Sequence, residues 1–452
     1  MAFTWAPRGS RWAAASAVAL ALWASAAPTL VYPAYAAEWH LTTAITTAVF
    51  AAYPVALIGT LLLLGGFAET VGSRNAILAG LGFLGLGALT FLLAPNLALL
   101  LTGRALMGIG VGLSLGPATS VIASSVIASA GRDGGRDRTG AITAGASSVG
   151  IITALLVGGA TVQYGPSPLH AAYGVLLAGV VVGLGAVWFL PRAVPRSVPG
   201  SAPGSAPGPA RTTAGRWRPR RLAVPERRMP FLAGTFGVSA AYALGAIFLG
   251  VGAQFARDTV RSDDAFANGV VLAISAAAIG VVALLAGRLR AATALRLGAF
   301  AAVAGQALMI TAGATHSMPF LVLYSLVGGA GYSLLFSGGV TLVTRSAPAE
   351  HRAATTSSAY LVAYLVQAVV ALGVGALGTA VDLQTALVAG SATVVALTLA
   401  ALLALRSPAS APGAVPALPV PSRAVPSQAV PSRATTSQAT SHDNLMKASS
   451  SR

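Results

Sequence analysis

The sequence predicts an all-α membrane protein whose twelve transmembrane helices form two pseudo-symmetric six-helix bundles. Three observations predict this fold: the composition, the number of long apolar stretches and the placement of the arginines. Apolar residues make up 55% of the chain, charged residues only 9%, and the mean hydropathy is +0.76. A soluble domain carries about 25% charged residues, so most of this surface must face lipid. The chain has no cysteine, which excludes disulfides, thiolate metal sites and cysteine nucleophiles.

Long apolar stretches account for most of the chain. A helix of about 20 apolar residues crosses the roughly 30 Å hydrocarbon core of a bilayer. Twelve such spans are expected, at 13–33, 42–64, 76–94, 97–128, 141–163, 171–190, 230–253, 265–287, 296–314, 318–343, 356–378 and 385–405. Strands of a membrane barrel would be alternating segments of about 10 residues, which these stretches are not.

The arginines between these spans predict the orientation. Of the 28 basic residues, 25 fall on the side of the two termini and only Arg257 and Arg261 fall on the other, with Arg104 inside a span. The positive-inside rule then places both termini in the cytoplasm of a multi-pass plasma-membrane protein. Basic runs between apolar stretches indicate topology and not nucleic-acid binding. Alternatively, the start of the chain through 34–36 is a cleaved signal peptide, which would leave eleven spans.

Composition also divides the chain into parts. Residues 1–190 and 230–405 are expected to be the two six-helix bundles. Between them, 191–229 is a linker rich in proline, glycine, serine and arginine, and 406–452 is a low-complexity tail. Both have too little apolar surface to fold, so disorder is expected. The linker arginines are expected to lie against anionic membrane lipid.

The two halves carry similar segments. The loop after the second span, 65–74, and the loop after the eighth, 287–296, both begin with glycine and end with arginine ten positions on. Residues 106–110 in the fourth span match 326–330 in the tenth at nearly the same offset. Together these matches indicate a duplicated six-helix unit.

The 65–74 loop places Gly65, Glu69, Gly72 and Arg74 at fixed spacing, with Phe67 third. This pattern resembles the G-x-L-A-D-R-x-G-R-R loop of the major facilitator superfamily, with Phe67 for leucine and Glu69 for aspartate.

The fourth span carries a second motif of this kind. Residues 104–110 resemble the family's R-x-x-Q-G-x-G, with Met107 in place of glutamine. The 32–35 and 50–53 segments are similar to its drug-efflux-like branch. In the fifth span, 154–155 depart from the antiporter motif, whose Gly-Pro pair is Ala-Leu here.

The resemblance implies a secondary transporter that moves a small amphipathic or drug-like molecule by alternating access. It implies efflux with proton coupling, a monomer and no cofactor. A facilitator, a uniporter or an importer of a small metabolite is the alternative. A non-transporting membrane receptor or an integral membrane enzyme is the alternative from another functional class. An enzyme is not expected, because no span carries an acid or a histidine at its centre, and no metal site is expected.

The resemblance also implies a cytoplasmic gate. Glu69 would meet the start of the eleventh span, near 355–357, where free backbone N–H groups favour a carboxylate. Arg74 would pair with acids or lipid phosphates. The alternative for Glu69 is a solvated loop acid.

Arg104 is the only ionisable residue well inside a span. It lies about 12 Å past Asn96, deep within a half-thickness of about 15 Å. Such a charge is costly and usually faces the protein interior or a water-filled cavity. The alternative is that its long side chain snorkels to the surface.

The substrate cavity is expected to be lined by polar and aromatic residues inside the spans. Three of them, Tyr360, Tyr364 and Gln367, share one helical face. The expected lining residues are Tyr32, Tyr53, Met107, Tyr242, Tyr332, Tyr360, Tyr364 and Gln367. Such a lining favours a neutral or cationic amphipathic compound, and ordinary helix packing is the alternative for each residue.

Proton coupling would need a titrating group near the outer mouth. Glu38, His40 and Asp382 are the candidates there, and exposed loop residues are the alternative interpretation. No acid lies at the centre of a span.

Overall fold

The structure is a computed structural model that describes residues 6–64, 66–130, 135–191, 225, 228–258, 260–347 and 351–406. The predicted tail and nearly all of the predicted linker lie outside the described residues, as does Gly65. Every regular element in the described part is a helix.

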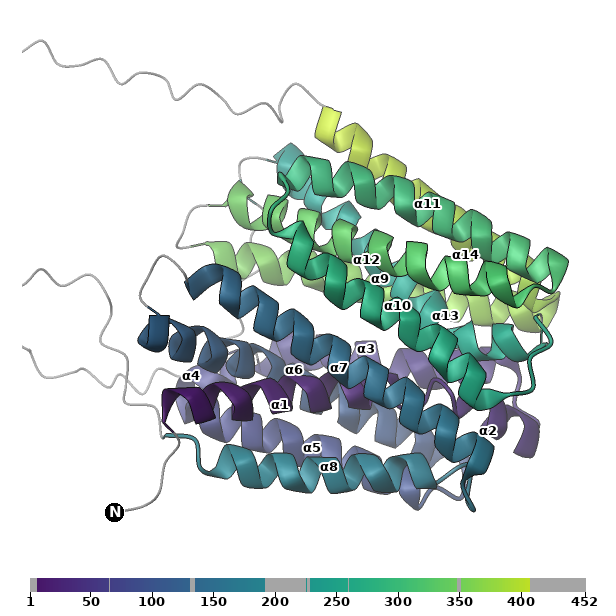
Figure 1. Cartoon of the computed structure of the whole chain (residues 1–452), viewed down its shortest axis with the longest axis horizontal. Helices are drawn as coiled ribbons and strands as arrows, with labels where there is room; N and C mark the ends of the chain where they lie inside the picture. The colour runs from purple at the N-terminus through teal and green to yellow at the C-terminus, as the bar shows by residue number, and fades with distance from the viewer. Residues whose placement is uncertain are drawn as a thin grey trace, which may run out of the picture. The chain divides into compact units, whose positions relative to one another are not determined.

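Among the described residues, the first half contains eight helices and the second half six, arranged as Figure 1 shows. Their bounds are α1 Pro7–Ala26, α2 Tyr32–Glu38, α3 Thr43–Leu64, α4 Phe67–Val71, α5 Ser73–Leu92, α6 Leu97–Ala130, α7 Gly135–Tyr164, α8 Ala171–Trp188, α9 Arg228–Asp258, α10 Ala265–Ala286, α11 Ala291–Thr315, α12 Met318–Ser346, α13 Arg352–Ala380 and α14 Leu383–Arg406. Eleven of the described helices are long and apolar enough to cross a bilayer.

Helix α1 lies at the position of the predicted first span but is not among these eleven helices. It is 20 residues long and packs against α6, α7 and α8. The predicted first span, 13–33, differs from the structure in one respect, because the helix ends at Ala26 and a turn leads into α2. Pro28 has no N–H to donate to the carbonyl of Ala24, and Thr29 donates instead to Ala26. The break therefore leaves two carbonyls of α1 without a helical partner.

The two halves pack in the same way. In the first half α6 contacts α1, α3 and α5, and in the second half α12 contacts α9, α10 and α11. Likewise α8 packs on α5, as α14 packs on α11 (Figure 1). Equivalent helices make equivalent contacts, which is the pseudo-symmetry that the sequence predicts.

Glycines allow the close approaches within each half. A Cβ on Gly80 of α5 would lie 2.7 Å from the carbonyl oxygen of Gly110 on α6. A Cβ on Gly339 of α12 would lie 2.7 Å from that of Gly234 on α9. Small residues let backbones meet in a membrane, where van der Waals packing replaces the hydrophobic effect.

Hydrogen bonds join the halves at the arginine-poor end. Thr29 donates to the carbonyl of Leu249 at 3.0 Å, and Arg257 donates to that of Pro33 at 2.9 Å. The backbone N–H of Ala44 donates to Thr379 Oγ1 at 2.8 Å. This end therefore holds the two halves together.

Candidate functional site

Arg104 is a fully buried cation in the first half. Its side chain has 0% exposure, so it does not snorkel to the surface. Its Nη1 donates to the carbonyl oxygen of Ser25 at 3.1 Å and lies 3.4 Å from that of Ala24. These are the carbonyls that the Pro28 break leaves free. The helix break at Pro28, just after α1, thus provides the carbonyl acceptors that bind Arg104 of α6.

Two aromatic rings of α3 cover the guanidinium. The Arg104 Cζ lies 4.8 Å from the ring centroid of Tyr53 and 5.6 Å from that of Phe50. Such cation–π contacts stabilise a desolvated cation. Gly108 brings α3 close, because a Cβ there would collide with the carbonyl of Tyr53. The Nε and Nη2 atoms of Arg104 are buried with no partner among the described residues, so two strong donors remain for an acceptor.

The second half contributes a cluster of five rings, called here the tyrosine cluster. The Tyr242 centroid lies 4.7 Å from that of Tyr364 in an edge-on contact and 6.4 Å from that of Tyr360. The cluster consists of Tyr242 from α9, Tyr332 and Phe336 from α12, and Tyr360 and Tyr364 from α13. Three helices therefore present aromatic faces to one place.

Helix α9 connects the two groups. A Cβ on Gly250 would lie 3.6 Å from the Phe50 ring, and one on Gly245 would lie 3.4 Å from Tyr332 and 3.8 Å from Gln367 Nε2. Five residues span about 7.5 Å along a helix. The Arg104 group and the tyrosine cluster therefore meet α9 within about one and a half turns of each other.

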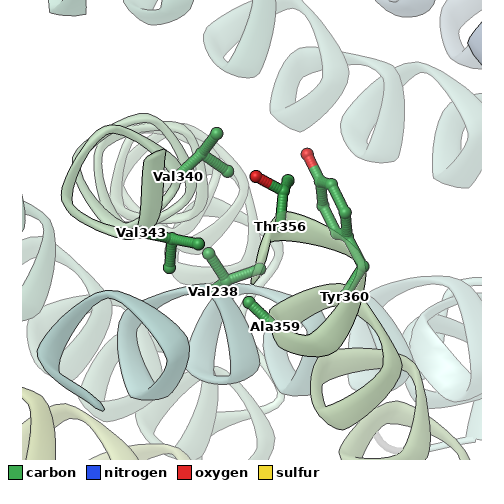
Figure 2. A pocket seen from close by; sticks show the side chains of 6 residues that line it. All are labelled: Val238, Val340, Val343, Thr356, Ala359 and Tyr360. Atoms are coloured by element: carbon green, nitrogen blue, oxygen red, sulfur yellow. The ribbon is translucent and has the colours of Figure 1, made fainter. Parts of the chain in front are cut away.

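A small apolar hollow lies beside the tyrosine cluster (Figure 2). Its walls come from α9, α12 and α13, and include Val238, Val340 and Val343. In Figure 2 the side chains of Thr356 and Tyr360 stand beside one another on α13, with the Thr356 hydroxyl turned toward Val340. Polar groups at this edge extend the cluster toward the start of α13.

Seven of the eight predicted cavity residues lie in the Arg104 group, in or beside the tyrosine cluster, or near the α1 break. Met107 is the exception. Met107 is fully buried, and a Cβ on Gly87 of α5 would lie 2.7 Å from its Cγ. The prediction for Met107 is corrected accordingly, because this side chain fills the α5–α6 packing. Tyr32 is buried beside the α1 break, and its hydroxyl has no partner among the described residues.

The predicted gate loop forms the short helix α4. Gly72 follows it with φ 84° and ψ 153°, a conformation essentially confined to glycine, and turns the chain into α5. Arg74 is buried and donates to the carbonyl of Trp188 from Nε at 3.0 Å and Nη2 at 2.7 Å. This backbone carbonyl takes the place of the predicted acid or phosphate. Glu69 is exposed on α4 and Thr355 in the predicted partner segment is fully buried; the gate contact between them stays a prediction.

The three outer candidates occupy exposed positions. Asp382 caps α14, where its carboxylate accepts from the Thr385 N–H at 2.8 Å and from the Thr385 hydroxyl at 2.6 Å. The hydroxyl bond first, and the N–H bond next, hold the pKa of Asp382 below its ordinary value. A charged cap fits this geometry better than a proton carrier. Glu38 ends α2, and His40 follows with φ 52°.

Two contributors to the site are absent from the sequence prediction. Phe50 lies in the 50–53 segment that resembles the family, but the sequence does not place it in the cavity. The carbonyl of Ala24 could have been found from Pro28, which necessarily frees the acceptor four residues before it, whereas that of Ser25 is free because Thr29 donates to Ala26.

Comparison with known proteins identifies the family. A sequence model of the Major Facilitator Superfamily matches residues 13–371. No curated protein sequence matches the chain. Similar solved structures include a peptide transporter POT in complex with sulfate, with TM-score 0.68, 17% identity and coverage of 88% of this chain and 94% of that one.

Two further structures share the fold. The nucleoside transporter NupG has TM-score 0.65, 14% identity and coverage of 88% of this chain and 100% of its own. A bacterial homolog of the human lysosomal transporter Spinster, inward-facing and occupied, has TM-score 0.64, 15% identity and coverage of 88% and 96%. With many apolar helices packed together and a family match over most of its length, the chain belongs to the Major Facilitator Superfamily and is a multi-pass membrane transporter, not an enzyme.

Proposed function

We propose that this transporter exports small amphipathic compounds that carry an aromatic or apolar body and a hydrogen-bond acceptor. The observation that carries the proposal is the pairing of the tyrosine cluster with the unpartnered donors of Arg104 across α9. Aromatic faces would stack on the apolar body, and the guanidinium would hold the acceptor.

The charge of the site narrows the substrate class. Within the described spans Arg104 has no carboxylate partner, so the site is positive. A desolvated cation repels a second cation strongly, because the effective dielectric is low. We therefore propose neutral or anionic substrates, which replaces the sequence-based expectation of neutral or cationic ones.

Alternating access follows from the way the halves meet. Their hydrogen bonds at the arginine-poor end support a state that opens toward the arginine-rich side. The arginine distribution favours a plasma-membrane protein with both termini on the cytoplasmic side. In that orientation, this state would bind substrate from the cytoplasm. Rocking of the two halves about the midplane site would then release it outside.

Two energy-coupling mechanisms are proposed for transport. Proton exchange is the first, with the monomer as the working unit. The placement of the acids favours a second, an uncoupled facilitator, because in the described chain Glu and Asp lie only in short segments or near helix ends. An intramembrane titrating carboxylate is the usual carrier of the proton.

Counterflow in proteoliposomes tests the substrate class. Proteoliposomes that contain the purified protein are loaded with a neutral, an anionic or a cationic aromatic compound of equal molecular size. Saturable exchange with the labelled compound is then followed. We expect exchange of neutral or anionic compounds, and Tyr364→Ala should raise the half-saturating concentration about tenfold. Tyr164→Ala is the matched control, since Tyr164 is 70% exposed at the end of α7. Exchange of cations alone would overturn the proposal.

A second experiment separates the two coupling versions and the orientation. Export from cells that overexpress the protein is followed while the proton gradient is collapsed. Export against a concentration gradient that stops on collapse supports proton coupling, whereas movement only down the gradient supports the facilitator. Labelling of cysteines introduced into the 191–229 segment, in intact cells and in opened cells, tests the cytoplasmic placement.

A further inference from the structure

A groove of about 590 Å³ runs along the outside of the first half. It lies between α1, α7 and α8, away from both the Arg104 group and the tyrosine cluster. Its walls are apolar and open, and Trp12 on α1, Val149 on α7 and Val182 on α8 are 64%, 57% and 73% exposed. In a membrane these side chains face hydrocarbon.

Small residues form the floor of this groove. A Cβ on Gly150 of α7 would collide with the carbonyl of Ala19, and one on Gly183 of α8 would collide with Leu20. Helix α7 therefore lies directly on the α1 backbone, and α8 packs closely on the Leu20 side chain of α1. The groove's hydroxyls are already used within their own helices, as Ser16 donates to the carbonyl of Ala13 at 2.9 Å. The floor therefore offers no free hydroxyl donor to a ligand, in addition to being built mainly of apolar residues.

The arginine-bearing end of the groove is basic. Arg8 is exposed, and the Arg11 Cζ lies 5.7 Å from the Trp12 ring centroid. The Nε of Arg11 is buried and has no partner among the described residues. Neither arginine has a carboxylate partner in that part of the chain. Arg8 and Arg11 are the chain neighbours of Gly9 and Trp12, which line the groove, so an anionic group attached to a hydrocarbon in the groove would meet two cations at this end.

We propose that the groove binds an anionic phospholipid from the leaflet on the arginine-rich side, with its phosphate at Arg8 and Arg11 and one acyl chain along α1. The length agrees with this ligand. From Trp12 to Trp23, both in the groove wall, α1 rises about 16 Å, which is close to half of the roughly 30 Å hydrocarbon core. The site stands apart from the proposed substrate site and does not depend on it.

Native mass spectrometry of the purified full chain tests the proposal. Dioleoylphosphatidylglycerol and dioleoylphosphatidylcholine serve as probes, because they share acyl chains and differ in charge. We expect one phosphatidylglycerol to be retained at least tenfold more tightly than phosphatidylcholine. The double variant Arg8→Gln with Arg11→Gln should lose this preference. The matched control Arg288→Gln with Arg290→Gln removes two exposed arginines from the same side of the other half and should keep it.

Fluorescence quenching locates the lipid and guards against a misfolded variant. Brominated phosphatidylglycerol should quench wild-type tryptophan emission, and Trp12→Phe with Trp23→Phe should remove most of that quenching while the thermal transition is unchanged. Equal retention of the two lipids by the wild type would overturn the proposal. So would a preference that survives the Arg8 and Arg11 substitutions.

Discussion

Replacement of Arg104 by glutamine should separate transport from stability. Arg104 presents two buried donors without a protein partner, Nε and Nη2. A hydrogen bond from a charged donor contributes about 1.5–3 kcal/mol, and each 1.4 kcal/mol is a factor of about ten. Arg104→Gln should therefore raise the half-saturating concentration of an anionic substrate by roughly 10- to 100-fold.

The folded state should change much less. The substitution forfeits the hydrogen bond to the carbonyl of Ser25 and the cation–π contact with Tyr53, the latter worth about 2 kcal/mol when desolvated. It also removes two unsatisfied buried donors, each costing about 1–3 kcal/mol. These opposing effects are of similar size, so the midpoint of thermal unfolding should move by no more than about 3 °C.

The assay is counterflow in proteoliposomes with the compounds that pass the substrate screen, paired with thermal unfolding in the same detergent. Arg104→Lys should not restore the wild-type value, because an ammonium lacks the planar fork that reaches both the α1 carbonyls and a ligand. Arg296→Gln is the control, since Arg296 is exposed on α11. Normal exchange by Arg104→Gln, or a collapse of the thermal transition, would refute a substrate role for Arg104.

Three further predictions follow from single contacts. Gly72→Ala forces a side chain into a conformation with φ 84° and should destabilise the α4–α5 turn by about 1–3 kcal/mol, seen as a lower unfolding midpoint; an unchanged midpoint would contradict the strain. Asp382→Asn should lower that midpoint at neutral pH. Because the folded-state pKa of Asp382 is lowered, its contribution is present above the ordinary aspartate pKa and disappears as pH falls through the folded value; a difference from wild type that grows in acid would contradict this sign. A disulfide between Ala44→Cys and Thr379→Cys, introduced where a 2.8 Å hydrogen bond joins the halves in a chain without native cysteine, should stop transport until it is reduced; full-rate transport by the cross-linked protein would exclude opening at this end.

Much of the fold can be read from the sequence because a bilayer imposes a simple length rule on apolar helices. The spacing of Tyr360, Tyr364 and Gln367 likewise assigns them to one face of α13. Each of these inferences depends only on residues that are close in the chain.

The tertiary structure decided what no local pattern contains. Met107 faces Gly87 instead of the site, because the side of a uniformly apolar helix that meets a neighbour is not marked by hydropathy. Arg74 binds the carbonyl of Trp188, a partner 114 residues away. The pocket for Arg104 is likewise built from carbonyls freed in α1 and rings from α3. The sequence by itself thus determined an all-helical membrane fold with two similar halves, and packing between distant helices determined which buried polar groups meet.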